Sequence, residues 1–467
     1  MAHPRRSLRS LIPQLRDGAV TAKQLLREAH DRASQLEPKL NAYKTWLSAY
    51  SERAAEAADA AFRAGAAVAP LQGIPISVKD IFGLDNAPIF AGTKRELPTT
   101  WNKEGPVVTE VRRQLAVFTG KTQTVEFAFG ALGVNSHWGT PRNPWDSVDH
   151  RVPGGSSSGA AVSLCQGSAL VAIGSDTAGS VRIPASLTAN VGFKPTQRRW
   201  PTAGIVPLSP LLDSPGILAR SVDDVHIAAA AIDSRVTSAY APLDSDMQGR
   251  EGLRLGVPEE FFWEDCTPSI AAEVNACLKE LERAGHKLVP IRVPEASDAH
   301  QIISEGGTSG AELLAFIRSD LPEWLKDLDP LIEQRLTASA HMSGIELADR
   351  MMRMRRLAAR AGRSFADVDA IVSPTVPIPP PKLSDVTSWD SYRTHNFRMI
   401  RYTCVANILD LPALSMPVAL DSSGLPIGLQ VMARVGTDQE LLQIGGAIER
   451  ILGTGRERLG YPPLAVD

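Results

Sequence analysis

Cysteine is scarce in this chain of 467 residues, and its four copies are scattered. They are Cys165, Cys266, Cys277 and Cys404. Because no two of them form a C-x-x-C pair, the sequence offers neither a disulfide framework nor a zinc knuckle. The nine histidines are dispersed without ligand spacing, so we expect no metal site. These patterns favour a cytoplasmic location.

Long apolar runs are also missing. After three arginines, the N-terminus offers only Leu11-Ile12 before Pro13, which is too short for a signal-peptide core. No run approaches the roughly 18 apolar residues that a membrane helix needs. The 49 Lys and Arg balance 52 Asp and Glu to a net charge of −3, so no overall basic field is present. We therefore expect neither a membrane nor a nucleic-acid partner.

The composition, with 43% hydrophobic and 22% charged residues, is that of a folded globular protein. The first 70 residues read as helices, with a capping box from Thr21 to Gln24 and an Ala-rich helix over 54–67. A strand is predicted from Gly73 to Asp80, and a helix over 109–116 precedes a strand over 117–120. This alternation favours a layered α/β fold.

Later segments continue the alternation. A buried strand is predicted at 169–173, a helix at 269–284 and a strand at 287–293. The basic helix at 346–362 is interpreted as a solvated face, and 374–381 as an extended connection. No internal repeat or linker is evident, so one compact catalytic body is predicted.

The most unusual composition lies between Gly154 and Thr196, where Gly, Ser and Ala dominate. A phosphate loop would need Lys and Ser or Thr after Gly159, but two alanines follow it. The run also matches the G-x-S-x-G elbow of esterases, but a polar segment precedes it and only His395 comes late enough to serve as a base. Both readings are weak.

A serine activated by a lysine is the third reading of this region. The turn from Asp176 to Pro184 follows the predicted strand, and Ala178 and Gly179 are small enough for the backbone to approach a substrate carbonyl. The amides of 177–180 are then candidates for an oxyanion hole. The alternative is a turn that serves packing only.

Several ordered motifs carry a family resemblance. They are G-I-P-x3-K-D at 73–80, the Gly/Ser-rich segment with G-F-K-P-T at its end, L-D-S-P-G at 212–216 and G-L-P-I-G-L-Q at 424–430. Together they resemble the amidase signature family of serine hydrolases, over about 21–449. The resemblance implies an α/β fold with a large central mixed β-sheet flanked on both faces by α-helices. It also implies a cofactor-independent enzyme and makes a homodimer plausible.

The chain is accordingly predicted to be a single amidase domain over 1–467. Its parts are a helical segment at 1–70, the signature core at 71–220 and the remainder of the α/β body at 221–467.

The resemblance implies a Ser-Ser-Lys triad. Ser180 matches the acylated nucleophile, Ser156 the bridging serine and Lys79 the base, with a cis peptide between Gly155 and Ser156. Lys79 can accept a proton only when neutral, so its apolar neighbours would have to lower its pKa. The oxyanion would rest on the backbone amides of Thr177, Ala178, Gly179 and Ser180.

Other residues have supporting roles in this reading. Ser157 would add a hydrogen bond, and Asp176 and Arg182 could brace the nucleophile turn through a charge-assisted contact. The resemblance makes four residues candidates for the substrate pocket: Ala128, Phe129, Trp138 and Trp145. No arginine that would hold a substrate carboxylate is identifiable from the sequence.

The predicted function is hydrolysis of a small-molecule amide, or a related carbamate or urea, to an acid and ammonia or an amine. One alternative is a glutamine-amidase subunit of a tRNA-dependent amidotransferase, which would depend on a partner protein. Another is a non-catalytic binding protein of the same fold, in which Ser180 would not react with an acylating probe.

Overall fold

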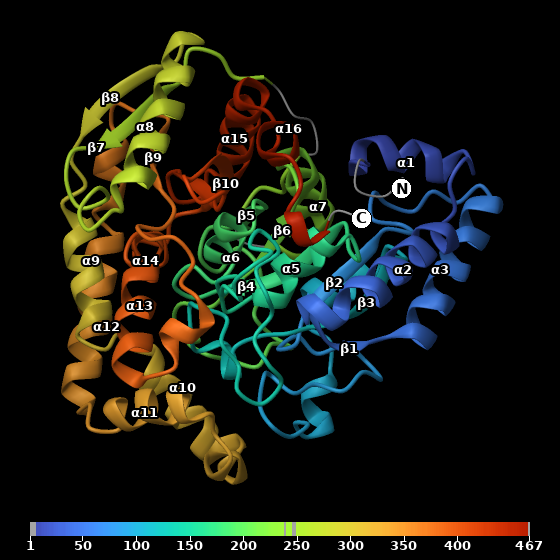
Figure 1. Cartoon of the computed structure of the whole chain (residues 1–467), viewed down its shortest axis with the longest axis horizontal. Helices are drawn as coiled ribbons and strands as arrows, with labels where there is room; N and C mark the ends of the chain where they lie inside the picture. Colours follow the sequence, from blue (N-terminus) through green and yellow to red (C-terminus); the bar gives the residue numbers. More distant parts are fainter. Residues whose placement is uncertain (1–5, 238–239, 245–248, 466–467) are drawn as a thin grey trace.

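The computed structural model describes residues 6–237, 240–244 and 249–465. Within them, one mixed sheet of 11 strands forms the spine, in the order β1-β3-β2-β4-β6-β5-β10-β11-β9-β7-β8. Helices pack along this sheet, with the N-terminal helices at one end and α8 to α14 at the other (Figure 1). The predicted α/β fold with a large mixed sheet is confirmed.

The strands have the following bounds: β1 Tyr43–Trp46, β2 Pro75–Lys79, β3 Val117–Thr122, β4 Val171–Asp176, β5 Val191–Lys194, β6 Ser214–Ala219, β7 Arg254–Pro258, β8 Lys287–Ile291, β9 Ala370–Pro374, β10 Ala413–Leu420 and β11 Pro426–Met432.

The α-helices have these bounds: α1 Leu8–Arg16, α2 Ala22–Leu40, α3 Ser48–Arg63, α4 Pro106–Arg113, α5 Ser158–Gln166, α6 Arg182–Leu187, α7 Val222–Val236, α8 Pro268–Arg283, α9 Glu295–Ser304, α10 Ser309–Asp320, α11 Pro330–Ser339, α12 Gly344–Ala358, α13 Trp389–Ile400, α14 Thr403–Ile408, α15 Asp438–Leu452 and α16 Gly455–Leu459. Short 3-10 turns connect them, among them η3 at Glu126–Ala128.

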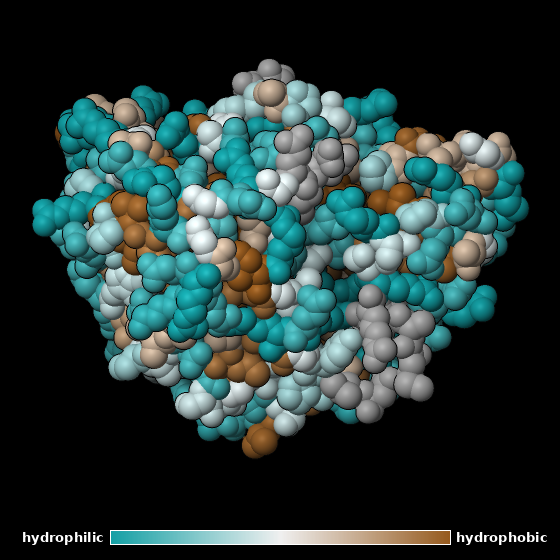
Figure 2. Space-filling view, turned by 90° about the horizontal axis from the view of Figure 1, so that it is seen from above, coloured by the Kyte–Doolittle hydropathy of each residue, from teal (hydrophilic) through white to brown (hydrophobic). Residues whose placement is uncertain are grey.

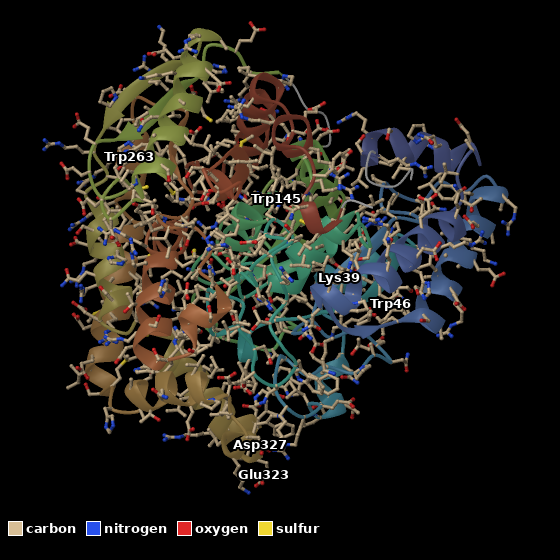
Figure 3. All side chains as sticks on the ribbon, in the orientation of Figure 1. Lys39, Trp46, Trp145, Trp263, Glu323 and Asp327 are labelled. Atoms are coloured by element: carbon tan, nitrogen blue, oxygen red, sulfur yellow. The ribbon has the colours of Figure 1, made fainter. Side chains whose placement is uncertain are left out.

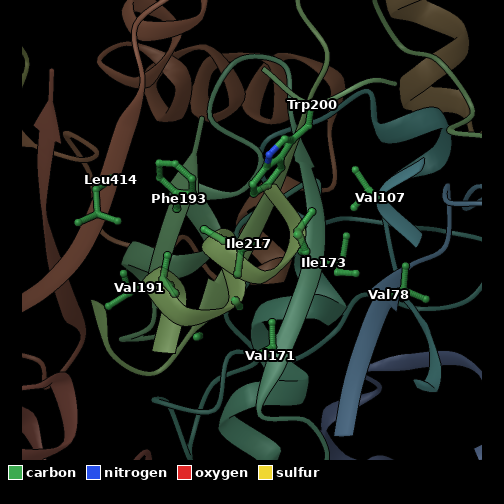
Figure 4. Close-up of a cluster of buried hydrophobic side chains, with 14 of the residues drawn as sticks. Val78, Val107, Val171, Ile173, Val191, Phe193, Trp200, Ile217 and Leu414 are labelled. Carbon is green, nitrogen blue, oxygen red and sulfur yellow. The ribbon is translucent and has the colours of Figure 1, made fainter. Parts of the chain in front are cut away.

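Alternate residues of the central strands serve two different cores, as the two-residue period of a strand requires. Ala172 of β4 and Leu218 of β6 pack in a cluster with small residues of α5 and α6. Their neighbours Ile173 and Ile217 belong to the large core on the other side, together with Trp200 (Figure 4). The central strands are therefore covered on both faces.

The interpretation of the first 70 residues as helical is wrong at Tyr43–Trp46, which form strand β1 because they pair with β3 at the edge of the sheet. The other predicted elements differ from the structure mainly at their ends. The Thr21 side chain caps α2 by accepting from the amide of Gln24 at 3.0 Å. The Gln24 side chain contacts Glu28 instead of closing the capping box. The Ala-rich helix predicted over 54–67 begins earlier, at Ser48, because the preceding residues continue its helical pattern.

The basic helix is not solvated along its whole length. Arg350 of α12 donates to the backbone carbonyl oxygens of Gly307 at 2.8 Å and Glu305 at 2.7 Å, and Arg353 pairs with the Glu305 carboxylate. These contacts fasten α12 to the turn between α9 and α10. The interpretation of this helix as a purely solvated face therefore needs correction.

The face seen in Figure 2 is mostly hydrophilic, and its apolar patches are separated by polar side chains. Among the described residues, no helix combines the length and apolar character needed to cross a membrane. The same residues contain no group of three or more His, Cys, Asp or Glu side chains that could hold a metal ion.

Candidate active site

The parallel strands β2 and β4 lie side by side, so their carboxyl ends meet at the same edge of the sheet. Lys79 is the last residue of β2, and Asp176 is the last residue of β4. The turn that follows Asp176 carries Ser180 and leads into α6, while Ser156 lies just before α5. The topology thus gathers the three residues of the predicted triad at one edge.

Lys79 is fully buried, and its ammonium group meets two hydroxyls. Its Nζ donates to Ser156 Oγ at 2.7 Å and to Ser175 Oγ at 2.9 Å. Burial lowers the pKa of Lys79 to about 7, although the charges of Asp213 and Asp176 oppose this shift. A lysine with this pKa is partly neutral near pH 7, which is the state a general base requires.

The serine run before α5 is held against the nucleophile turn. The Gly155–Ser156 peptide is cis. The Ser157 amide donates to the Ser180 carbonyl oxygen at 3.2 Å, and its hydroxyl donates to the Ser175 carbonyl oxygen at 3.2 Å. Ser157 therefore joins the serine run to the end of β4 and to the Ser180 turn.

A buried ion pair fixes the shape of the Ser180 turn. Arg182 Nε donates to Asp176 Oδ2 at 3.0 Å, and its Nη2 donates to Oδ1 at 2.9 Å. The same carboxylate accepts the backbone amides of Gly179 and Val181. Because the Gly179 amide is engaged in this way, Thr177, Ala178 and Ser180 are left as the main candidates for oxyanion donors.

Residues from the C-terminal half complete this support. Asn407 donates to Asp176 Oδ1 at 2.9 Å, and Gln430 accepts from Arg182 at 2.7 Å. Burial raises the pKa of Asp176, but the charge and hydrogen bonds of Arg182 outweigh it and hold that pKa below its usual value. Gly179 has φ +124°, and a Cβ there would collide with the Thr403 side chain, so only glycine fits.

A second buried carboxylate lies beside the turn. Asp213 accepts the Thr177 hydroxyl at 2.6 Å and the amides of Leu208 and Ser209 at 2.9 and 3.0 Å. All three donors are neutral, and burial raises the pKa of Asp213 to about 6. Asp213 connects the first residue of the predicted oxyanion hole to a neighbouring loop.

Ser180 opens into a cavity of about 70 Å³, here called the inner cavity. Its walls combine the Ser180 turn with residues of the C-terminal half. They include Ala128, Phe129, Thr177, Ala178, Leu208, Ile303, Ser309, Arg335, Asn396 and Ile400. A wider outer cavity of about 920 Å³ adjoins it. Phe129, Gly306, Arg335 and Phe397 line both.

The structure brings two of the four predicted pocket residues to the inner cavity, Ala128 and Phe129. Trp138 is not among its lining residues, because its indole donates to the Thr93 carbonyl oxygen and stacks under the Lys44 ammonium. Trp145, labelled near the centre of the view in Figure 3, is buried and donates to the Thr188 carbonyl oxygen. Both tryptophans serve packing in the described structure.

Sequence reasoning overlooked four groups at this site. Ser175, Asp213, Arg335 and Asn396 touch either Lys79, the nucleophile turn or the inner cavity. Ser175 directly precedes Asp176 of the nucleophile turn, and Asp213 lies in the L-D-S-P-G motif, so the sequence patterns around both residues could have identified them. Arg335 and Asn396 lie in α11 and α13, where no motif marks them.

Comparisons with known proteins identify the family of this chain. The Amidase family model matches residues 24–442. A 2-amino-5-chloromuconic acid deaminase from Comamonas testosteroni is 44% identical, over 98% of this chain and 98% of its own. A glutamyl-tRNA(Gln) amidotransferase subunit from Myxococcus xanthus (strain DK1622) is 32% identical, over 94% of this chain and 96% of its own.

Solved structures lead to the same class of protein. A crystal structure of an amidase, 29% identical, superposes with a TM-score of 0.85 and covers 96% of this chain and 100% of its own. The chain therefore belongs to the Amidase family, as the sequence motifs predict. It is a hydrolase that acts on amide C–N bonds of a small-molecule substrate. The amidotransferase relative is more distant from it than the deaminase.

Proposed function

We propose that this amidase works through an acyl-enzyme on Ser180, with Ser156 relaying a proton to Lys79. The observation that carries the proposal is the 2.7 Å contact between Lys79 Nζ and Ser156 Oγ in a fully buried setting. A lysine whose pKa is about 7 can take up a proton at neutral pH and return it later in the cycle.

The reaction balances in two halves. Ser180 Oγ bonds to the amide carbonyl carbon, its proton passes to Ser156, and the Ser156 proton passes to Lys79. The oxyanion accepts hydrogen bonds from backbone amides of the Ser180 turn. The C–N bond then breaks as the proton returns through Ser156 to the leaving nitrogen, releasing ammonia or an amine. Water hydrolyses the resulting ester by the same relay, which frees the acid and restores Ser180.

A panel of aliphatic, aryl and amino-acid amides, carbamates and ureas tests this proposal through release of ammonia or amine. Ser180→Ala and Lys79→Met should abolish release. Ser158→Ala is the matched control, because the Ser158 hydroxyl donates to the Gln123 carbonyl oxygen and not to Lys79. Mass spectrometry of the quenched enzyme should detect an acyl adduct on Ser180. Full release by Ser180→Ala would overturn the assignment.

A second candidate reaction is hydrolytic deamination of an amino-substituted unsaturated carboxylic acid. The observation that favours it is the 44% identity over nearly the whole chain to a 2-amino-5-chloromuconic acid deaminase. Ammonia release from 2-amino-5-chloromuconic acid, compared with release from simple amides, distinguishes the two. If simple amides react far faster, the deamination candidate fails.

The proposal also covers the location, the domain organisation and the assembly of the enzyme. The four cysteines are free thiols, which supports a reducing cytoplasmic location. We also propose one catalytic domain over 1–467, because the single sheet takes strands from all three predicted parts of the chain. A homodimer without nucleic acid is the assembly we propose, and light scattering of the purified protein tests it.

A further inference from the structure

Arg335 occupies the junction between the inner and outer cavities. It belongs to α11 and lines both cavities, as does Phe129, which lies far from it in the sequence. Of the described residues that line the inner cavity, Arg335 alone carries a formal charge. Arg335 is one of the four residues that line both cavities, so its side chain lies where the outer cavity meets the inner one.

The guanidinium is held in place without an anionic partner. Arg335 Nη1 donates to the Phe129 carbonyl oxygen at 2.7 Å, and the group stacks over the Phe129 ring, 3.6 Å from its centroid. No carboxylate of the described part of the chain forms an ion pair with it. Burial lowers the pKa of Arg335, although the nearby Tyr392 hydroxyl opposes the shift, and this reflects the cost of keeping the charge away from water.

These contacts leave most N–H donors of the Arg335 guanidinium available to a ligand. An arginine side chain has five N–H donors in a planar fork, and the Phe129 carbonyl and the Tyr392 hydroxyl engage only part of that set. The fork matches a carboxylate, which it can bind through two parallel hydrogen bonds. An entering carboxylate would also offset the unfavourable burial of the unpaired cation.

The other walls of the inner cavity fit a short, partly apolar acid. Leu208, Ile303 and Ile400 are apolar, and none of the described lining residues is acidic. Asn396 Oδ1 accepts the Ala131 amide, which orients the Asn396 Nδ2 group as a further donor. The inner cavity, at about 70 Å³, is much smaller than the outer cavity of about 920 Å³, so the group bound beside Ser180 is small.

We propose that Arg335 binds a carboxylate of the substrate, so that this enzyme acts on short carboxylic acids that also carry the scissile C–N bond. This proposal rests on the proposed function, because the scissile carbon must lie at Ser180 while the carboxylate binds Arg335 at the junction between the inner and outer cavities. Arg335 sets substrate specificity and takes no part in the proton relay.

Paired substrates of equal length test the proposal. Succinamate and butyramide differ chiefly in a terminal carboxylate, and malonamate with propionamide and glutaramate with pentanamide extend the series. In the wild-type enzyme, kcat/KM should be higher for the acid of at least one pair. Arg335→Gln should lower kcat/KM for that acid by about 10- to 150-fold, the range for charged hydrogen bonds, and change the neutral partner little.

Arg318→Gln is the matched control, since Arg318 is an exposed arginine on the neighbouring α10. It should keep the wild-type preference. Arg335→Lys should recover part of the preference by retaining the charge without the planar fork. If Arg335→Gln does not fold, the test moves to Arg335→Lys, which succinate should inhibit less tightly than it inhibits the wild type because the planar fork is lost.

The outcomes separate the two proposals. Equal rates on acids and neutral amides, unchanged in Arg335→Gln but lost in Ser180→Ala, would overturn the role of Arg335 and leave the acyl-enzyme intact. Rates that survive Ser180→Ala while still depending on Arg335 would do the reverse.

Discussion

The signature core and the C-terminal half build the active site in different ways. In the core, Lys79, Ser156 and Ser180 come from two neighbouring parallel strands and the turns beside them. The C-terminal half contributes Arg335 and Asn396 from separate helices, and these line the cavity without touching the proposed relay. The proposed chemistry is thus concentrated in one compact unit, while the proposed substrate contacts come from distant parts of the chain.

The largest expected effect falls on the core. Lys79→Met should lower kcat by about 10³-fold or more, because removal of one member of a unit that transfers protons disables the whole unit. Steady-state ammonia release measures it, and an unchanged melting temperature shows that the protein is folded. A loss of less than tenfold would contradict the role of Lys79 as the base.

The next prediction concerns the brace that joins the two halves. Arg182→Met should reduce the free energy of unfolding by about 3–5 kcal/mol, since it leaves the buried Asp176 carboxylate without its cationic partner. Denaturant unfolding measures the loss. Arg356→Met, on the exposed side of α12, is the comparison and should change stability little. Equal stabilities would show that the brace contributes nothing.

The pH dependence of kcat/KM tests the electrostatics of the signature core. In the proposed mechanism neutral Lys79 is the active form, so kcat/KM should rise with pH through about 7, the lowered pKa of this lysine. Asp213→Asn removes a negative charge that favours protonated Lys79, so the acidic limb should move to lower pH, by about half a unit or more.

Thr177→Val is a graded version of the same test. It removes the hydrogen bond that most opposes the raised pKa of Asp213, so less of this carboxyl is ionised near pH 7, and the acidic limb should move in the same direction as in Asp213→Asn but by less. Movement of the limb to higher pH in Asp213→Asn would refute the electrostatic role of Asp213.

The smallest effect is expected outside both regions. Trp138→Phe keeps an aromatic ring beside Lys44 and loses the hydrogen bond to Thr93, so stability should fall by about 1 kcal/mol. Its kcat/KM should stay within about twofold of wild type, because a typical change away from the reacting groups is small. A large loss of activity would return Trp138 to the substrate pocket.

The sequence marked the residues of the proposed catalytic triad. The motifs around Lys79, Ser156 and Ser180 placed each residue next to a strand end or a glycine turn, and local geometry does the rest. The predicted contact between Asp176 and Arg182 is likewise a short-range pair that crosses one turn. Such features follow from chain neighbours and therefore leave a pattern in the sequence.

The cavity walls left no such pattern. Trp138 and Trp145 are aromatic and follow Gly120-Lys121-Thr122, yet each donates to a backbone carbonyl oxygen and neither lines the inner cavity. Arg335 looks like any helical arginine until α11 packs beside Phe129. The proposed role of Arg335 depends on its surroundings in the folded protein, where no carboxylate of the described residues forms an ion pair with it.

The sequence by itself determined the family and the α/β fold and supplied the proposed reactive side chains, because these depend on strand periodicity, glycine turns and ordered motifs. Only the tertiary structure decided which charges are buried and which groups face the substrate. Burial and proximity are properties of the packed chain, since they set the desolvation that lowers the pKa of Lys79 and leave Arg335 without an anionic partner at the cavity neck.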